Sequence, residues 1–156
     1  MTSTWRLITR LIGLALLCTS ALASAKDYTV GDITVQAPWS QALPPNAPTM
    51  AAYFVIGNHG TYPDRLVSVD TPIAGSAQLH QHLHQDGMMK MQPLDSLQIN
   101  PEEDAVFAPM SYHVMLLDLH DDAPRAEGEH FPLTLHFEKA GDVTVDVEVS
   151  STAPKR

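Results

Sequence analysis

The sequence predicts an all-β sandwich, and three observations support this fold class. β-Branched residues recur in short runs with period-two alternation, helical periodicity is nearly absent, and turn-forming residues separate the runs at short intervals. Short strands at such a spacing are typical of a β-sandwich. The chain of 156 residues suits one domain once its first segment is set aside.

Residues 1–25 have the features of an export signal. Two arginines come first, residues 11–17 form a short apolar run, and small residues at 21–25 supply a cleavage site. The apolar run is too short to span a bilayer, and no later stretch is apolar enough to do so. Cys18 raises lipidation as an alternative, but the bulky leucines before it make a poor lipoprotein cleavage site. We therefore expect a mature periplasmic domain of residues 26–156.

Composition excludes several classes of function. The mature domain would contain no cysteine, so it has no disulfide and no thiolate ligand, and a blue-copper electron carrier, which needs a cysteine ligand, is not expected. A net charge of −9 without a basic stripe argues against nucleic acid and anionic lipid as partners. No Ser/His/Asp or Cys/His constellation stands out, so we expect a binding protein and not an enzyme. We also expect a monomer.

The predicted strands follow one another along the mature chain. They span residues 33–36, 50–57, 65–69, 78–84, 88–93, 97–99, 105–107, 113–119, 133–137 and 143–149. Turn residues punctuate them at 58–60, 86–87, 127–128 and 140–142. The proline-rich piece at 42–49 is most simply a crossing loop between the first two predicted strands.

The Asp-Gly pair at 86–87 predicts a hairpin with a two-residue turn. In that register His82 faces Met91 and His84 faces Met89. The period-two rule adds His80 to the same face. One face of the hairpin then carries three histidines and two methionines.

A later predicted strand also presents a histidine and a methionine together. His113 and Met115 share a face, with Cα atoms roughly 7 Å apart at the usual strand rise. We expect Leu117 and Leu119 to continue this face into the core. The candidate ligands would then lie where a core-facing stripe runs out at the end of the sandwich.

Four of these residues form the pattern His, ten residues, Met, twenty-one residues, His, any residue, Met. We call His80, Met91, His113 and Met115 the quartet. Methionine alone is more often core filler than ligand, but together two imidazoles and two thioethers form a soft, uncharged ligand set. Thioethers bind oxygen-preferring ions poorly and Cu(I) well. The quartet therefore predicts a monovalent copper site.

The His-x-His-x-His run of His80, His82 and His84 is a plausible Zn(II) or Cu(II) site in its own right, because imidazole suits both ions. We expect His80 to be a primary ligand. The other two, with Met89, are secondary candidates that surround it, hold a second and weaker ion such as Cu(II), or help to load the first. The alternative function is a periplasmic Cu(II)/Zn(II) buffer or a copper-tolerance protein, and a metal-free interaction sandwich is a further possibility.

The quartet resembles the signature of the PCuAC family of periplasmic copper chaperones. The similarity extends from about residue 31 to about residue 149 and includes the runs APW at 37–39, PPNAPTMAAYFVIGN at 44–58, DRL at 64–66 and PLTLHFEKAG at 132–141. The resemblance implies a cupredoxin-like Greek-key β-sandwich that delivers Cu(I) to the dinuclear CuA centre of cytochrome c oxidase subunit II. It also implies a thioredoxin-like, Sco-type copper protein as a partner that keeps the target cysteines reduced.

Overall fold

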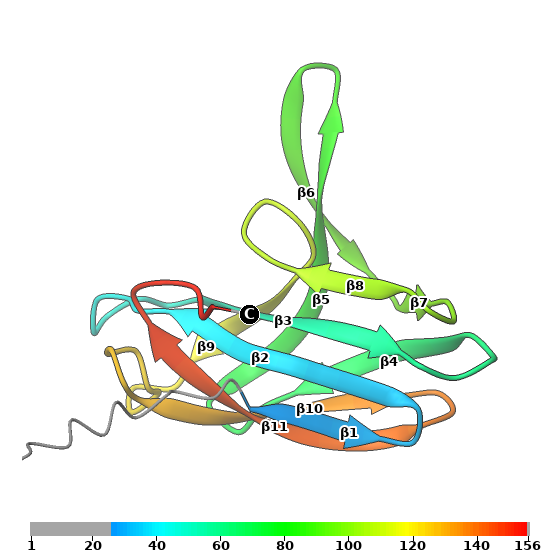
Figure 1. Ribbon diagram of the computed structural model, residues 1–156. Helices are drawn as coiled ribbons and strands as arrows, with labels where there is room; N and C mark the ends of the chain where they lie inside the picture. The colour runs from blue at the N-terminus through cyan, green and yellow to red at the C-terminus, as the bar shows by residue number, and fades with distance from the viewer. Residues whose placement is uncertain (1–25, 156) are drawn as a thin grey trace, which may run out of the picture.

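The computed structural model describes residues 26–155, which form strands and loops with no helix among them (Figure 1). The strands are β1 (Asp27–Val30), β2 (Ile33–Gln41), β3 (Met50–Asn58), β4 (Asp64–Asp70), β5 (Ala74–Gln85), β6 (Met88–Leu94), β7 (Leu97–Ile99), β8 (Asp104–Phe107), β9 (His113–Leu119), β10 (His130–Phe137) and β11 (Gly141–Ser150). The predicted all-β fold class is confirmed. The predicted export signal lies outside the described residues. Within residues 26–155 no helix is long and apolar enough to cross a membrane.

Each predicted strand overlaps an observed one, and the proline-rich piece at 42–49 is the loop between β2 and β3. One observed strand was not predicted from the sequence: β1, which has four residues and pairs with β2 through a turn at Gly31. Gly31 has a φ of 54°, in the left-handed region that glycine adopts without strain. The strand is short and half polar, so it carries little alternation by which to recognise it.

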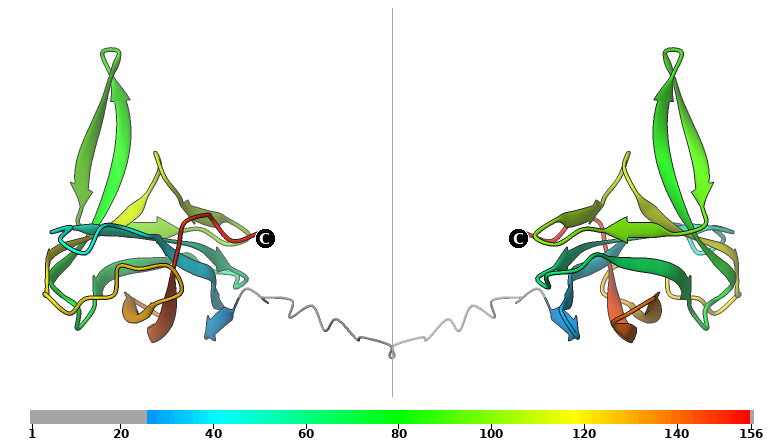
Figure 2. Two further views of the ribbon diagram at one scale, coloured as in Figure 1. Left: turned by 90° about the vertical axis from the view of Figure 1, so that its left-hand side faces the viewer. Right: turned by 90° about the vertical axis from the view of Figure 1, so that its right-hand side faces the viewer.

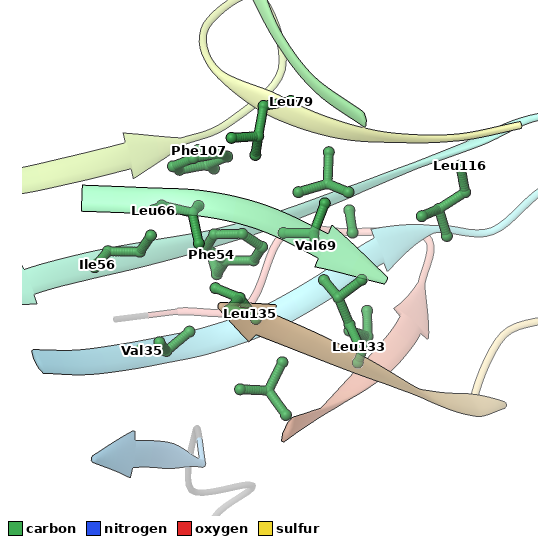
Figure 3. Packing of buried hydrophobic residues seen from close by; sticks show 14 of the residues in the cluster. Val35, Phe54, Ile56, Leu66, Val69, Leu79, Phe107, Leu116, Leu133 and Leu135 are labelled. Carbon is green, nitrogen blue, oxygen red and sulfur yellow. The ribbon is translucent and has the colours of Figure 1, made fainter. Parts of the chain in front are cut away.

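The strands belong to one sheet that folds over on itself, with the neighbour order β6-β5-β9-β3-β2-β11-β10-β4-β7. Neighbours that are distant in the chain, such as β3 with β9 and β4 with β10, give the crossed connections of a Greek-key sandwich. Figure 3 shows Phe54 of β3 beside Leu66 of β4 and Leu135 of β10, and Leu116 of β9 and Leu133 of β10 belong to the same buried cluster. Each such buried side chain contributes roughly 2 kcal/mol to stability.

The β5–β6 hairpin projects beyond the body of the sandwich (Figures 1 and 2). Its turn consists of Asp86 and Gly87, with φ values of 53° and 74°. Two successive left-handed residues are what a type I′ turn requires, and this turn matches the twist of the strands that it joins. The predicted two-residue turn is therefore confirmed, and with it the pairing of His82 with Met91 and of His84 with Met89.

The expectation that Leu117 and Leu119 both join the core is wrong for Leu117 and correct for Leu119. In β9 the residues that face the core are Val114 and Leu116, which are fully buried. Since successive strand residues alternate between faces, His113, Met115 and Leu117 lie on the opposite face of the sheet. Leu117 is only half-buried there and does not continue a ligand face into the core. Leu119, which follows the left-handed Asp118 with its φ of 55°, does pack against the core. Apolar residues stand on both faces of this strand, so the alternation alone did not identify the inner one.

Arg125 fastens two loops beside the sandwich. Its side chain is 7% exposed and donates hydrogen bonds to the carbonyl oxygens of Ala47, Ala123 and His120, at 3.1, 2.8 and 2.9 Å. These bonds join the loop between β2 and β3 to the loop between β9 and β10. The buried charge is acceptable because its N–H groups are satisfied by carbonyl oxygens.

We predict that Arg125→Met lowers the free energy of unfolding by about 3 kcal/mol, because buried carbonyl groups left without a donor cost roughly 1–3 kcal/mol each. Urea denaturation of the metal-free protein measures this loss. The control is Arg65→Met, which removes an exposed ion pair with Glu138 at 3.7 Å and should change stability by less than about 1 kcal/mol. Equal losses in the two variants would contradict the role given to Arg125.

Candidate metal centre

The register of three adjacent strands assembles the candidate ligands. β5 lies between β6 and β9, and on it His80 is directly opposite His113 of β9. Met115 lies one step along the same face of β9, opposite Gln78, and Met91 lies on β6, opposite His82. Because paired residues share a face, the whole quartet is on the face of the sheet turned away from the core.

Three imidazole rings meet at this position. The ring centroids of His80 and His113 are 5.6 Å apart, and those of His82 and His113 are 5.1 Å apart, each pair edge to face. His113 is only 4% exposed although it lies on the outer face of the sheet. The rings of His80 and His82 on the hairpin lie against His113 and help to cover it.

Hydrogen bonding leaves several ring nitrogens available. His113 Nδ1 lies 3.2 Å from the carbonyl oxygen of Ser111, to which it can only donate, so its Nε2 keeps a lone pair. His80 Nε2 pairs with the Gln78 side-chain oxygen at 3.1 Å. The Nδ1 atoms of His80 and His82 are buried and have no hydrogen-bond partner. Buried polar atoms without partners are rare, and nitrogen atoms left free in this way fit a bound metal ion.

Burial also sets the charge of the rings. Desolvation lowers the pKa of His80 below the usual imidazole value. Desolvation is also the largest cause that lowers the pKa of His113; the hydrogen bond to Ser111 opposes it, and the nearby His82 and His80 add to it. The neutral form of both rings is therefore favoured at neutral pH. Neutral imidazole is the form that binds metals.

The thioethers flank the imidazoles. Met115 is half-buried on β9, whereas Met91 is 49% exposed on the edge strand β6. The two methionines thus stand on opposite sides of β5. An ion held by the imidazole rings would therefore have the partly shielded sulfur of Met115 on one side and the accessible sulfur of Met91 on the other.

Of the secondary candidate ligands, His82 lies nearer to the buried ring of His113 than His84 does. His82, assigned from the sequence to the surroundings of His80, has its ring closer to His113 than the ring of His80 does. His84 is exposed near the hairpin tip and contacts Met89, with 3.4 Å between Nδ1 and the sulfur. Within residues 26–155 no three side chains of His, Cys, Asp or Glu are placed to hold a metal ion by themselves. The three alternate histidines are thus not arranged as a nitrogen-only site in the part of the chain that the structure describes.

Two supporting groups were not anticipated from the sequence. Gln78 hydrogen-bonds His80, and the carbonyl oxygen of Ser111 orients His113. Gln78 is two residues before His80, so the period-two rule could have placed it on the ligand face. The role of Ser111 depends on the path of the loop before β9, which carries no sequence signal of its own.

Together these features define a cupredoxin-like all-β domain with a soft, uncharged set of candidate metal ligands beside its projecting hairpin. Residues 33–149 match the model of a lipoprotein family described as LpqE-like. The copper-bound PCuAC domain from PmoF2 is 30% identical, with 81% of this chain and 99% of that chain covered and a TM-score of 0.68. The chain therefore belongs to the LpqE-like family of PCuAC domains, and the resemblance noted in the sequence is confirmed.

Other solved structures agree with this assignment. Apo-DR1885 from Deinococcus radiodurans is 27% identical over 100% of both chains, with a TM-score of 0.61. The CuI form of DR1885 is also 27% identical, with 89% of each chain covered and a TM-score of 0.62. A comparison with curated proteins finds no match.

We predict that His113 in the metal-free protein titrates below the usual imidazole range, because burial and the neighbouring rings disfavour its charged form. Replacing His82 by Gln should raise the pKa of His113, because the variant removes a nearby positive charge. NMR titration of the ring nitrogens measures both. A His113 that titrates above the usual range, or is indifferent to the substitution, would contradict the close packing of these rings.

Proposed function

We propose that this protein is a periplasmic metallochaperone that binds Cu(I). The observation that carries the proposal is the group of contacting imidazoles, with buried nitrogens that lack partners, flanked by two thioethers. Support also comes from relatives of the same family, among them the copper-bound PCuAC domain from PmoF2 and the CuI form of DR1885. Copper is here a cargo, so the role of the site is binding and release, without catalysis.

Each member of the quartet has a distinct role in this proposal. His80 and His113 supply nitrogen ligands that are neutral at neutral pH. Met91 and Met115 supply thioethers, which give the preference for Cu(I) over harder ions. No ligand carries a charge, so the site holds copper less firmly than a group of thiolates would. Met91, the exposed ligand, is the first that an incoming Cys or His of an acceptor would displace.

The proposal also covers the protein that receives the copper and the compartment in which the chaperone acts. We propose the CuA centre of cytochrome c oxidase subunit II as acceptor, with a Sco-type thioredoxin-like protein as partner and the chaperone acting as a monomer. Family resemblance supports this choice of acceptor. The predicted signal at residues 1–25 supports export, as does the description of the LpqE-like family as lipoproteins. That description keeps lipidation of Cys18 as the alternative to cleavage after residue 25.

An anaerobic competition titration against a chromogenic Cu(I) chelator tests the site. We expect the wild type to bind one tight equivalent and Met91→Ala/Met115→Ala to bind about a hundredfold more weakly, on the basis of roughly tenfold, or 1.4 kcal/mol, for each lost thioether.

The control is Met88→Ala/Met110→Ala, which removes two exposed methionines outside the quartet and should leave the affinity unchanged. Equal Cu(I) binding by the wild type and the quartet variant would show that the histidines, without the thioethers, form the site. Preference for Zn(II) or Cu(II) in parallel titrations would favour the metal-buffer alternative.

Deleting the gene tests the acceptor. Under copper limitation we expect a loss of cytochrome c oxidase activity that added copper restores, because excess copper bypasses a delivery protein. Complementation by the wild type, but not by Met91→Ala/Met115→Ala, should restore activity at low copper. Normal oxidase activity with loss of copper tolerance would instead indicate detoxification.

A further inference from the structure

The face of the hairpin that carries part of the quartet continues to the tip with a second pair of donors. His84 of β5 is directly opposite Met89 of β6, one step beyond the pair formed by His82 and Met91. Consecutive pairs on one face of a strand are separated by roughly 7 Å. His–Met pairs therefore follow one another from the tip towards the buried rings of His80 and His113.

The tip pair, His84 and Met89, has the geometry to bind one ion. Its Nδ1 and sulfur atoms are 3.4 Å apart, so both can reach the same metal. Neutral imidazole carries its proton on one nitrogen only; with that proton on Nε2, the lone pair of Nδ1 lies beside the thioether. The donor types are those that suit Cu(I). Both residues are exposed, so any ion bound there remains accessible to solvent and to other ligands.

His82 connects the tip pair to the buried rings. Its Nδ1 is buried without a partner, its ring is 5.1 Å from that of His113, and its backbone neighbour across the hairpin is Met91. His113 is 4% exposed and Met89 is 46% exposed, so accessibility rises along the same face from the rings to the tip. A copper ion that moves from the hairpin tip to the buried imidazole rings would find a histidine or methionine donor at each step along this face.

We propose that the tip pair is a second, weaker Cu(I) site that loads the quartet, with the ion moving inward by ligand exchange through His82 and Met91. This inference rests on the proposed function of the quartet. Copper stays monovalent throughout, so no electron is transferred, and each step breaks one metal–ligand bond as another forms. The alternative is that His84 and Met89 are joined only by an N–H···S hydrogen bond.

Methyl NMR of the methionines during anaerobic Cu(I) addition separates these interpretations. In the wild type the first equivalent should shift Met91 and Met115, and a second, weaker equivalent should shift Met89. In His84→Gln/Met89→Leu the second equivalent should be lost, the affinity for the first should be unchanged, and stopped-flow loading from a Cu(I)–chelator complex should be several-fold slower. The matched control is Met88→Leu, which alters the neighbouring methionine on the other face of the hairpin.

The tip site is overturned if the wild type binds one equivalent with Met89 unaffected, or if the tip variant keeps its second equivalent. Its loading role is overturned if the tip variant loads as fast as the wild type. Met91→Ala/Met115→Ala separates this proposal from the previous one: loss of the first equivalent alone supports the quartet, whereas an unchanged first equivalent refutes the quartet and not the tip site.

Discussion

The register of β5 between β6 and β9 is the constraint on which the site depends. Strand side chains alternate with a period of two, so a slip by one residue would turn every donor of the hairpin to the wrong face. The register is held by Leu79, which lies opposite Val114 and is buried with it in the core, and by the tight turn at Asp86 and Gly87. The packing of the core and the tight hairpin turn therefore position the candidate ligands.

Placing the ligands outside the core has an energetic consequence. The Nδ1 atoms of His80 and His82 are buried without partners, and an unsatisfied buried group costs about 1–3 kcal/mol. Such a cost lowers the stability of the metal-free protein and is recovered when an ion supplies the missing partner, since a ligand that binds only the folded state stabilises it. The same burial lowers the pKa of His80 and of His113, which favours the neutral form of imidazole that metals bind.

The sequence predicted local features well because they depend on near neighbours. The Asp86-Gly87 turn and the alternation beside it fixed the hairpin pairing, and strands with clear period-two patterns were all found. Two features depended on distant pairings and were not predictable in the same way. Which face of β9 is inner is decided by its contacts with β3 and β5, because Met115 and Leu117 are as apolar as Val114 and Leu116. The contact of His82 with His113 likewise requires the β5–β9 pairing, which joins residues some thirty positions apart in the sequence.

The imidazole and thioether donors differ in their exposure to solvent, and this difference suits the proposed transfer of copper to an acceptor. The imidazoles are the more buried ligands and are held by hydrogen bonds to Gln78 and Ser111, whereas Met91 stands exposed on an edge strand with one open side. A thioether carries no proton at any ordinary pH, so its exchange needs no proton transfer and is limited by access alone. In the proposed transfer, an acceptor that approached β6 would meet the sulfur of Met91 first, while the rings still held the ion. Release would then proceed one ligand at a time, without a free metal ion.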